Sequence, residues 1–202
     1  NNPNNQFNYV TVSDGGTYWG WNYALVYVGD GAQLNIQNST ISNADNIGLF
    51  AEHNSTLPTF ANNTFKNNTI VGLNISARHI GNLDGASVYD DGNGEPFIYA
   101  RGTSVGTNQT WKKLSAPVLM NDNLEIEAGL VINPGFVLWM ETSSSIQVET
   151  SGYLTAEGTA SEIITIQGRY SSPGYWEGIK VRSVNPNNKL NYTHVKDGGS
   201  YW

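Results

Sequence analysis

The chain of 202 residues contains no cysteine, which excludes disulfides, thiolate metal sites, iron–sulfur clusters and cysteine nucleophiles. Charged residues are sparse at 13%, and 10 lysines and arginines face 17 acidic residues. Because nucleic-acid binding needs a basic stripe that neutralises phosphates, the net charge of −7 argues against a nucleic-acid partner. Long apolar runs are also missing: the longest clean ones span only about five residues, such as 136–140, so the sequence predicts no membrane span.

Asparagine and glycine are abundant instead, at 26 and 22 residues. Both types tolerate tight turns and left-handed backbone, so the composition indicates a chain rich in turns. With 39% apolar residues, the chain still has enough hydrophobic material for the core of one domain. It begins with Asn1 rather than methionine, and we expect it to be a processed product or a piece of a longer protein.

A long internal repeat is the clearest feature of the sequence. The segment 2–19 (NPNNQFNYVTVSDGGTYW) returns without a gap as the segment 185–202 (NPNNKLNYTHVKDGGSYW), with 12 of 18 positions identical. The two segments are either similar rungs of one solenoid or the same rung in neighbouring copies of a tandem array. We favour the array, because the sequence between them contains neither the NPNN nor the DGG-[TS]-YW motif.

A shorter period lies inside the long one. Apolar and polar residues alternate over three to six positions, and Ile47 and Leu49 recur two dozen positions later as Val71 and Leu73. Short strands at this period, without sustained helical periodicity, predict an all-β parallel solenoid in which inward-facing asparagines form ladders between rungs. An antiparallel β-sandwich is the alternative, but the DG and NG pairs do not lie between matched alternating runs.

Two segments resemble the right-handed parallel β-helix repeat family, which includes pectate lyases. ISNADNIGLFAEHNSTLPTFANNTFKNNTIVGLNIS (residues 41–76) resembles rungs that read i-s-N-N-x-x-x-G-[ILF]-x-[VAI]. NLEIEAGLVINPG and SIQVETSGYLTAEGTASEIITIQG (residues 123–135 and 145–168) resemble the companion rung pattern. The family contains pectin-degrading lyases and hydrolases, but also large bacterial surface proteins with no assigned activity. The resemblance therefore implies a right-handed parallel β-helix and leaves the activity open.

The pattern divides the chain into three parts. We expect β-helix rungs in residues 1–83, an irregular turn-rich insert in residues 84–120, and further rungs in residues 121–202, which include the second copy of the repeat. In the resembling proteins a similar stretch sits just ahead of the first rungs. This resemblance implies that a new cassette begins near Phe97.

No residue pattern predicts a catalytic site. Glycoside hydrolysis needs two carboxylates that face each other across a groove. The candidate pairs more closely fit exposed charges on strands and turns: Glu125/Glu127, Glu141/Glu149, Glu157/Glu162 and Asp90/Asp91. The lyases of the resembling family need an aspartate cluster that binds Ca²⁺ and a nearby Arg or Lys, and no rung stacks several aspartates. The three histidines lack the spacing of metal ligands. We therefore predict a protein that is not an enzyme.

One loop has the composition of a calcium site. In Asp90-Asp91-Gly92-Asn93-Gly94-Glu95, oxygen ligands stand at alternate positions, as they do in Ca²⁺-binding loops. The following residue is Pro96, where an EF-hand loop would have glycine, and an ordinary polar turn is the alternative. We expect no cofactor other than this candidate calcium ion.

Aromatic residues gather around the repeated motif. Exposed aromatic faces stack on sugar rings, while a packed rim or a contact between neighbouring cassettes is the alternative use. The candidate residues for carbohydrate or inter-repeat contact are Tyr18, Trp19, Trp21, Tyr175, Trp176, Tyr201 and Trp202.

These observations together predict a non-catalytic structural or adhesive module of an extracellular or cell-surface protein, exported by a bacterial type of secretion. Stacked cassettes would form a stiff rod or fibre, so the expected partners are neighbouring copies of the repeat, with glycans as a second candidate. A carbohydrate-binding or polysaccharide-degrading β-helix protein, of the lyase or glycoside hydrolase type, is the alternative. An ice-binding module is less consistent with the sequence, because the threonines form no TxT ladder.

Overall fold

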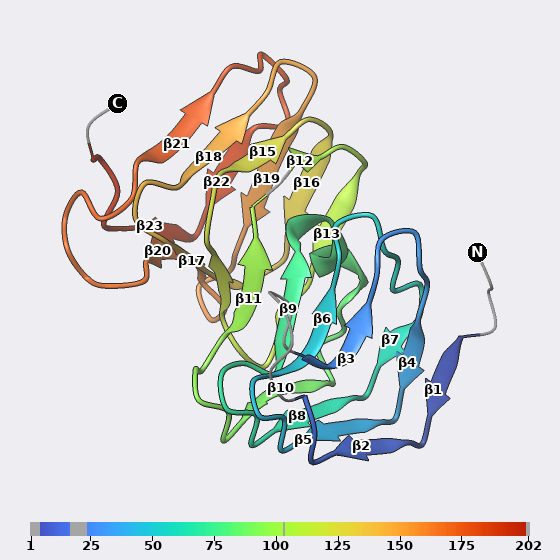
Figure 1. Cartoon of the computed structure of the whole chain (residues 1–202). Helices are drawn as coiled ribbons and strands as arrows, with labels where there is room; N and C mark the ends of the chain where they lie inside the picture. The colour runs from blue at the N-terminus through green and yellow to red at the C-terminus, as the bar shows by residue number, and fades with distance from the viewer. Residues whose placement is uncertain (1–4, 17–23, 103, 201–202) are drawn as a thin grey trace. The chain divides into compact units, whose positions relative to one another are not determined.

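The computed structural model describes residues 5–16, 24–102 and 104–200 (Figure 1). The chain forms two compact units. Unit 1 comprises residues 1–99 and 114–116, and unit 2 comprises residues 100–113 and 117–202. Short strands that pair in parallel dominate both units. The predicted all-β parallel β-solenoid is therefore confirmed.

In unit 1 the chain visits three parallel sheets in turn and adds one strand at each visit (Figure 1). The first sheet contains β1 (Gln6–Asn8), β4 (Asn35–Gln37) and β7 (Phe60–Ala61). The second contains β2 (Thr11–Ser13), β5 (Thr40–Ser42), β8 (Thr64–Lys66) and β10 (Val88–Asp91). The third contains β3 (Ala24–Val28), β6 (Ile47–Ala51) and β9 (Leu73–Ser76), after which comes the 3₁₀ helix η1 (Ala77–Asn82).

The register of these strands reproduces the short period of the sequence. Thr40 faces Thr64, and Leu49 faces Leu73, so these coils repeat at the predicted spacing. Because the side-chain period of a strand is two, this register keeps the same face of every coil turned inward. The buried face stacks like residues on one another, as Ile41 does on Phe65.

Left-handed backbone marks both ends of the second sheet of unit 1. Residues one coil apart share this conformation, with φ from 51° to 61°: Tyr9, Asn38 and Asn62 before the sheet, and Asp14, Asn43 and Asn67 after it. Asparagine and aspartate adopt left-handed φ more readily than other residues with a side chain. The abundance of asparagine in the sequence is thus explained in part by these corners.

Buried asparagines connect the coils of unit 1 from inside. Asn63 accepts a hydrogen bond from the backbone N–H of Ser39 (3.1 Å) through its Oδ1. Asn68 accepts one from the N–H of Ala44 (3.1 Å) and donates Nδ2–H to Oδ1 of Asn93 (2.8 Å). The predicted inward asparagine ladder is therefore present, and it satisfies backbone groups at corners where the strand ladders are interrupted.

Unit 2 repeats the three-sheet winding with four coils. Its first sheet contains β12 (Ser104–Val105), β15 (Leu124–Ile126), β18 (Ser145–Val148) and β21 (Gly178–Val181). Its second contains β13 (Gln109–Trp111), β16 (Gly129–Ile132), β19 (Tyr153–Glu157) and β22 (Lys189–Asn191). Its third contains β14 (Val118–Met120), β17 (Val137–Met140), β20 (Ile164–Gly168) and β23 (Thr193–Val195).

The coils of unit 2 vary in length. Val118 faces Leu138 in the shortest coil step, whereas the step by which Ile146 faces Ile179 is more than half as long again. The extra residues of that step lie mainly in the loop that precedes β21. A solenoid accommodates such loops because each coil needs only its strands to stack on the neighbouring coil.

The segment 84–120 differs from the expected irregular insert. It contains the strands β10, β12, β13 and β14, and also β11 (Ile98–Arg101), within which the two units divide. β10 pairs with β8, and β12 pairs with β15. The segment looked irregular in sequence because its strands are only two to four residues long and lie between polar turns.

Candidate functional site

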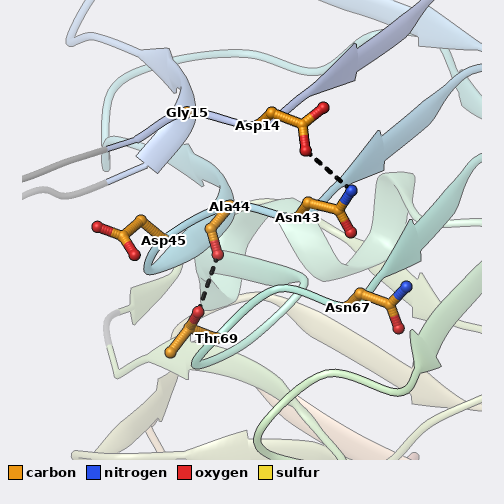
Figure 2. A pocket seen from close by; sticks show the side chains of 7 residues that line it. All are labelled: Asp14, Gly15, Asn43, Ala44, Asp45, Asn67 and Thr69. Atoms are coloured by element: carbon orange, nitrogen blue, oxygen red, sulfur yellow. Dashed lines mark hydrogen bonds between the residues drawn. The ribbon is translucent and has the colours of Figure 1, made fainter.

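A pocket lined mainly by polar residues lies at a corner of unit 1 (Figure 2). It has a volume of about 390 Å³. Three successive coils contribute to it, each through the left-handed corner that follows the second sheet. Its lining residues are Asp14, Gly15, Asn43, Ala44, Asp45, Asn67 and Thr69.

Hydrogen bonds fix part of this corner pocket. Asn43 donates Nδ2–H to Oδ1 of Asp14 (3.0 Å), and the Thr69 hydroxyl donates to the backbone oxygen of Ala44 (3.1 Å). The hydrogen bond from Ser13, together with that from Asn43, lowers the pKa of Asp14. Asp14 is therefore a carboxylate at neutral pH and already has two donors.

The two carboxylates of the pocket do not form an acid–base pair. Figure 2 shows the carboxylate of Asp14 turned towards Asn43, whereas the side chain of Asp45 points away from both. Hydrolysis of a glycosidic bond needs two carboxyl groups that converge on one bond. What the pocket presents is a polar surface of carboxylate, amide and hydroxyl groups, which suits hydrogen bonding to a polyhydroxyl ligand.

The acidic loop predicted to bind calcium consists of the end of β10 and the turn that follows it. Asn93 contributes its side chain to the internal ladder, because its Oδ1 accepts hydrogen bonds from N–H (2.9 Å) and Nδ2–H (2.8 Å) of Asn68. Partial burial, and to a smaller extent the charge of Asp91, raises the pKa of Asp90. Within residues 5–16, 24–102 and 104–200, no three acidic, histidine or cysteine side chains lie together as metal ligands would. Calcium binding by Asp90, Asp91, Asn93 and Glu95 stays a prediction.

Five of the seven predicted aromatic contact residues lie outside the described residues, namely Tyr18, Trp19, Trp21, Tyr201 and Trp202. Trp176 is described, and of the alternatives for it the packed aromatic applies, because it presents no face to a sugar. Its side chain is fully buried, and its Nε1–H donates to the backbone oxygen of Lys196 (2.7 Å). The indole packs beneath Gly198 in the second copy of the DGG turn, so Trp176 serves the core of unit 2.

Tyr175 joins a half-buried polar cluster that the sequence did not reveal. Its hydroxyl donates to Oε2 of Glu141 (2.6 Å), and Arg169 donates to Oε1 of the same carboxylate (2.9 Å). Partial burial and the hydrogen bond to Glu141 raise the pKa of Tyr175 to about 12. Burial alone would raise the pKa of Glu141, but the hydrogen bonds from Tyr175 and Arg169 outweigh it, and the pKa is lowered. At neutral pH Glu141 is thus a carboxylate and Tyr175 a neutral phenol.

The cluster has a signal in the sequence that alignment of rungs would reveal. Met140 faces Gly168 in the register of β17 and β20, so Glu141 and Arg169 occupy equivalent positions one residue later. The single-sequence pattern located both strands, but it did not fix their relative register, because the loop between them is long.

Three of the other candidate carboxylates of unit 2 face cations or amides. Glu149 pairs with Arg182, and Glu162 pairs with Lys113 at 2.8 Å. Glu157 accepts a hydrogen bond from Nδ2–H of Asn191 (3.0 Å). The contacts of Glu149 and Glu157 connect neighbouring coils, and the Lys113–Glu162 pair joins coils two steps apart, which is a structural arrangement of charge.

A buried serine–histidine cluster in unit 1 is also structural. Nδ1 of His79 accepts a hydrogen bond from the backbone N–H of Ser76 (3.3 Å), and its Nε2 lies 2.9 Å from the backbone oxygen of Ser55. The hydroxyl of Ser76 lies 3.2 Å from Nδ1 of His53. Ser76 is fully buried and caps η1, so no substrate can reach its hydroxyl in this structure.

Among the described residues, no helix has the length and hydrophobicity that a membrane crossing requires. Comparisons with family models, with curated proteins and with solved structures gave no match to this chain. The parallel β-solenoid is therefore a conclusion from the structure itself, and the finer resemblance to pectate-lyase-like repeats stays a prediction.

Proposed function

We propose that this chain is a non-catalytic structural or adhesive module of an extracellular protein, in which tandem copies of the long repeat stack into a stiff rod. One observation carries the proposal: the long repeat recurs in backbone conformation as well as in sequence. Tyr9 and Asp14 have φ of 57° and 61°, and their counterparts Tyr192 and Asp197 have φ of 44° and 63°. Residues that are not glycine rarely adopt this conformation, so the agreement supports two copies of one local structure.

Stacking of coils explains why such a repeat would be useful. Each coil adds about 4.8 Å to the length of a solenoid and contacts only its neighbours, so added copies extend the structure without a new fold. Right-handed winding, membership of the pectate-lyase-like repeat family and exposure at a cell surface are parts of the same proposal. The carboxylates paired with Arg, Lys, Tyr and amide groups favour a structural role over catalysis.

A two-copy protein tests the proposal. Residues 1–202 would be followed directly by residues 20–202, so that Trp202 takes the place of Trp19. Small-angle X-ray scattering should show the maximum dimension increasing by roughly 35 Å over the single chain, which serves as the control. A two-copy protein whose cross-section grows while its length stays constant would contradict the rod.

Carbohydrate binding is the second candidate, and the polar corner pocket favours it. Its carboxylate, amide and hydroxyl groups match the hydrogen-bonding needs of a sugar. Titration with a panel of acidic and neutral polysaccharides, followed by tryptophan fluorescence and by calorimetry, tests this use. Asn67→Gly is the matched variant, because glycine keeps the left-handed corner and removes the amide. Release of reducing ends or of unsaturated sugars would overturn the non-catalytic assignment.

A further inference from the structure

The last coil of unit 2 presents an open edge. Within the described residues, β21, β22 and β23 each pair on one side only, with β18, β19 and β20. Their core-facing apolar residues remain partly in solvent: Val181 is 54% exposed, Leu190 45% and Val195 43%. A cavity of about 150 Å³ opens between them, lined mainly by Val148, Leu154, Ile179, Val181 and Leu190.

The first coil of unit 1 contains the other copy of the repeated motif and shows which strands stack on it. β1 and β2 carry the first copy of the repeated motif, so Phe7 corresponds to Leu190 and Val12 to Val195. There, Phe7 faces the buried Ile36 of β4, and Val12 faces the buried Ile41 of β5. The repeated motif therefore has a known stacking partner, which is the coil that contains β4 and β5.

Side chains at the corners of the motif also have partners there. Asn38 donates Nδ2–H to Oδ1 of Asn8 (3.0 Å), and Asn43 donates Nδ2–H to Oδ1 of Asp14 (3.0 Å). In the second copy of the motif the corresponding residues are Asn191 and Asp197. Asn191 uses its Nδ2–H for Glu157, so its Oδ1 is the atom that can accept a hydrogen bond from a next coil.

We propose that the edge of β21, β22 and β23 is the docking surface for the β3, β4 and β5 strands of a second, tandem copy of the repeat, which begins at residue 20 and so has no β1 or β2 of its own. The repeat sets the register: Leu190 faces Ile36 of the second copy, and Val195 faces its Ile41. Asn38 and Asn43 of the second copy then donate to Asn191 and Asp197. β22 and β23 thereby act as β1 and β2 of the next copy, so that neighbouring copies share one coil.

The third strand pair completes the joint. In the chain, β3 follows the first occurrence of the repeated motif, and β21 precedes the second occurrence. In the two-copy protein, β3 of the second copy is therefore the next strand that can stack on β21. Both strands alternate in the same way, with Ile179 and Val181 facing the core in β21 and Val26 and Val28 doing so in β3. At the opposite end of the repeat, Phe7, Val26 and Val28 line an open cavity of about 430 Å³ beside β1 and β3. Apolar residues thus meet apolar residues across the whole joint.

This inference rests on the proposed function and specifies how neighbouring copies join. The test therefore distinguishes a wrong joint from a wrong rod. In the two-copy protein, His194→Cys in the first copy and Thr40→Cys in the second should form a disulfide on mild oxidation, because Thr11, the counterpart of His194, faces Thr40. The chain has no cysteine of its own, so any disulfide within one molecule reports this pair. Adjacent parallel strands bring Cα atoms within the range that a disulfide requires. Most of the protein should shift to the oxidised band on a non-reducing gel.

Two controls make the outcome decisive. Thr11→Cys with Thr40→Cys in the single chain is the positive control for the same geometry. Lys196→Cys with Thr40→Cys of the second copy is a register control, since two residues along a strand shift the cysteine by about 6.6 Å and take the Cα pair beyond the roughly 7 Å that a disulfide tolerates. Cross-linking of the Lys196 pair in preference to the His194 pair would overturn the proposed register.

The remaining outcomes are also distinct. If neither inter-copy pair cross-links while the scattering data show an elongated protein, the rod stands and the joint is wrong. If neither cross-links and the protein is not elongated, both proposals fail. Should the positive control itself stay reduced, hydrogen exchange decides: amides in residues 189–195 should exchange at least tenfold more slowly in the two-copy protein than in the single chain, and equal rates would overturn the joint.

Discussion

Units 1 and 2 wind in the same way but hold their coils together by different polar contacts. After its first coil, unit 1 has coils of nearly constant length, and it has left-handed asparagine corners and buried ladders through Asn63 and Asn68. Unit 2 has coils of unequal length and adds ion pairs between them, such as the half-buried pair of Glu141 with Arg169 and the exposed pair of Glu162 with Lys113. Neutral internal ladders are insensitive to salt and pH, whereas exposed ion pairs are screened and contribute little. The comparison predicts that mutations of polar residues cost more in unit 1 than in unit 2.

The largest effect should come from the buried ladder of unit 1. Asn63→Ala removes the acceptor of the Ser39 N–H and the donor to the Ile36 oxygen, both in a buried environment. Leaving both groups unpaired should lower the free energy of unfolding by about 2 to 5 kcal/mol. Urea unfolding combined with peptide-level hydrogen exchange would locate this loss in unit 1.

Asn62→Gly is the matched control for that variant. Asn62 lies next to Asn63 and also forms an inter-coil bond, but it is more exposed, and glycine keeps its φ of 55°. Its loss should stay below about 0.5 kcal/mol, as for most surface substitutions. Equal losses for the two variants would show that burial of the ladder is not what stabilises unit 1.

The corners should give the next largest effect. Asn43 has φ of 55°, and alanine in this conformation is strained, so Asn43→Ala should cost about 1 to 2 kcal/mol. Asn43→Gly loses the same hydrogen bond to Asp14 without this strain and should cost less than about 1 kcal/mol. Chemical unfolding of the two variants side by side measures the difference. If alanine were tolerated as well as glycine, the conformational explanation for the asparagine content would fail.

Sequence reasoning predicted these features to different depths. The strand alternation and the regular spacing of the early rungs were sufficient for the solenoid, because both follow from a side-chain period of two and a constant coil length. The asparagine ladder was predictable for the same reason: at nearly constant coil length, Asn68 falls next to Asn93 without knowledge of the structure. Where the coil length is regular, the register between neighbouring strands can be inferred from a single sequence.

The sites were less predictable because unit 2 breaks that regularity. The cluster of Glu141, Arg169 and Tyr175 joins residues 28 and 34 positions apart, across a coil whose length no local pattern sets. Trp176 shows a second limit, since its sequence neighbours are polar or turn-forming and suggest exposure. Its burial depends on the second copy of the DGG turn, which returns over it from the following coil and is therefore a long-range contact.

Tyr175 makes the polar contacts of unit 2 testable by pH. Its pKa rises from 10.0 to about 12 on folding, so the folded state holds the proton more tightly than the unfolded state. The associated stability is fully present below pH 10 and is lost as the pH rises from 10 towards 12. Urea midpoints should therefore fall over this range in the wild type and fall less in Tyr175→Phe, which has no proton to lose. An equal alkaline loss in the variant would assign the effect to other residues.

The smallest effect should come from the exposed ion pair of Lys113 with Glu162. The charged groups lie 2.8 Å apart, but their side chains are 59% and 46% exposed, so water and salt screen the attraction. Lys113→Met keeps the aliphatic stem, and we expect it to change the free energy of unfolding by less than about 0.5 kcal/mol, with no difference left at high salt. A loss well above about 1 kcal/mol, retained in salt, would mean that such contacts hold unit 2 as firmly as the buried ladders hold unit 1. In that case the variable coil lengths of unit 2 would depend on its surface charges, rather than on the apolar core beneath them.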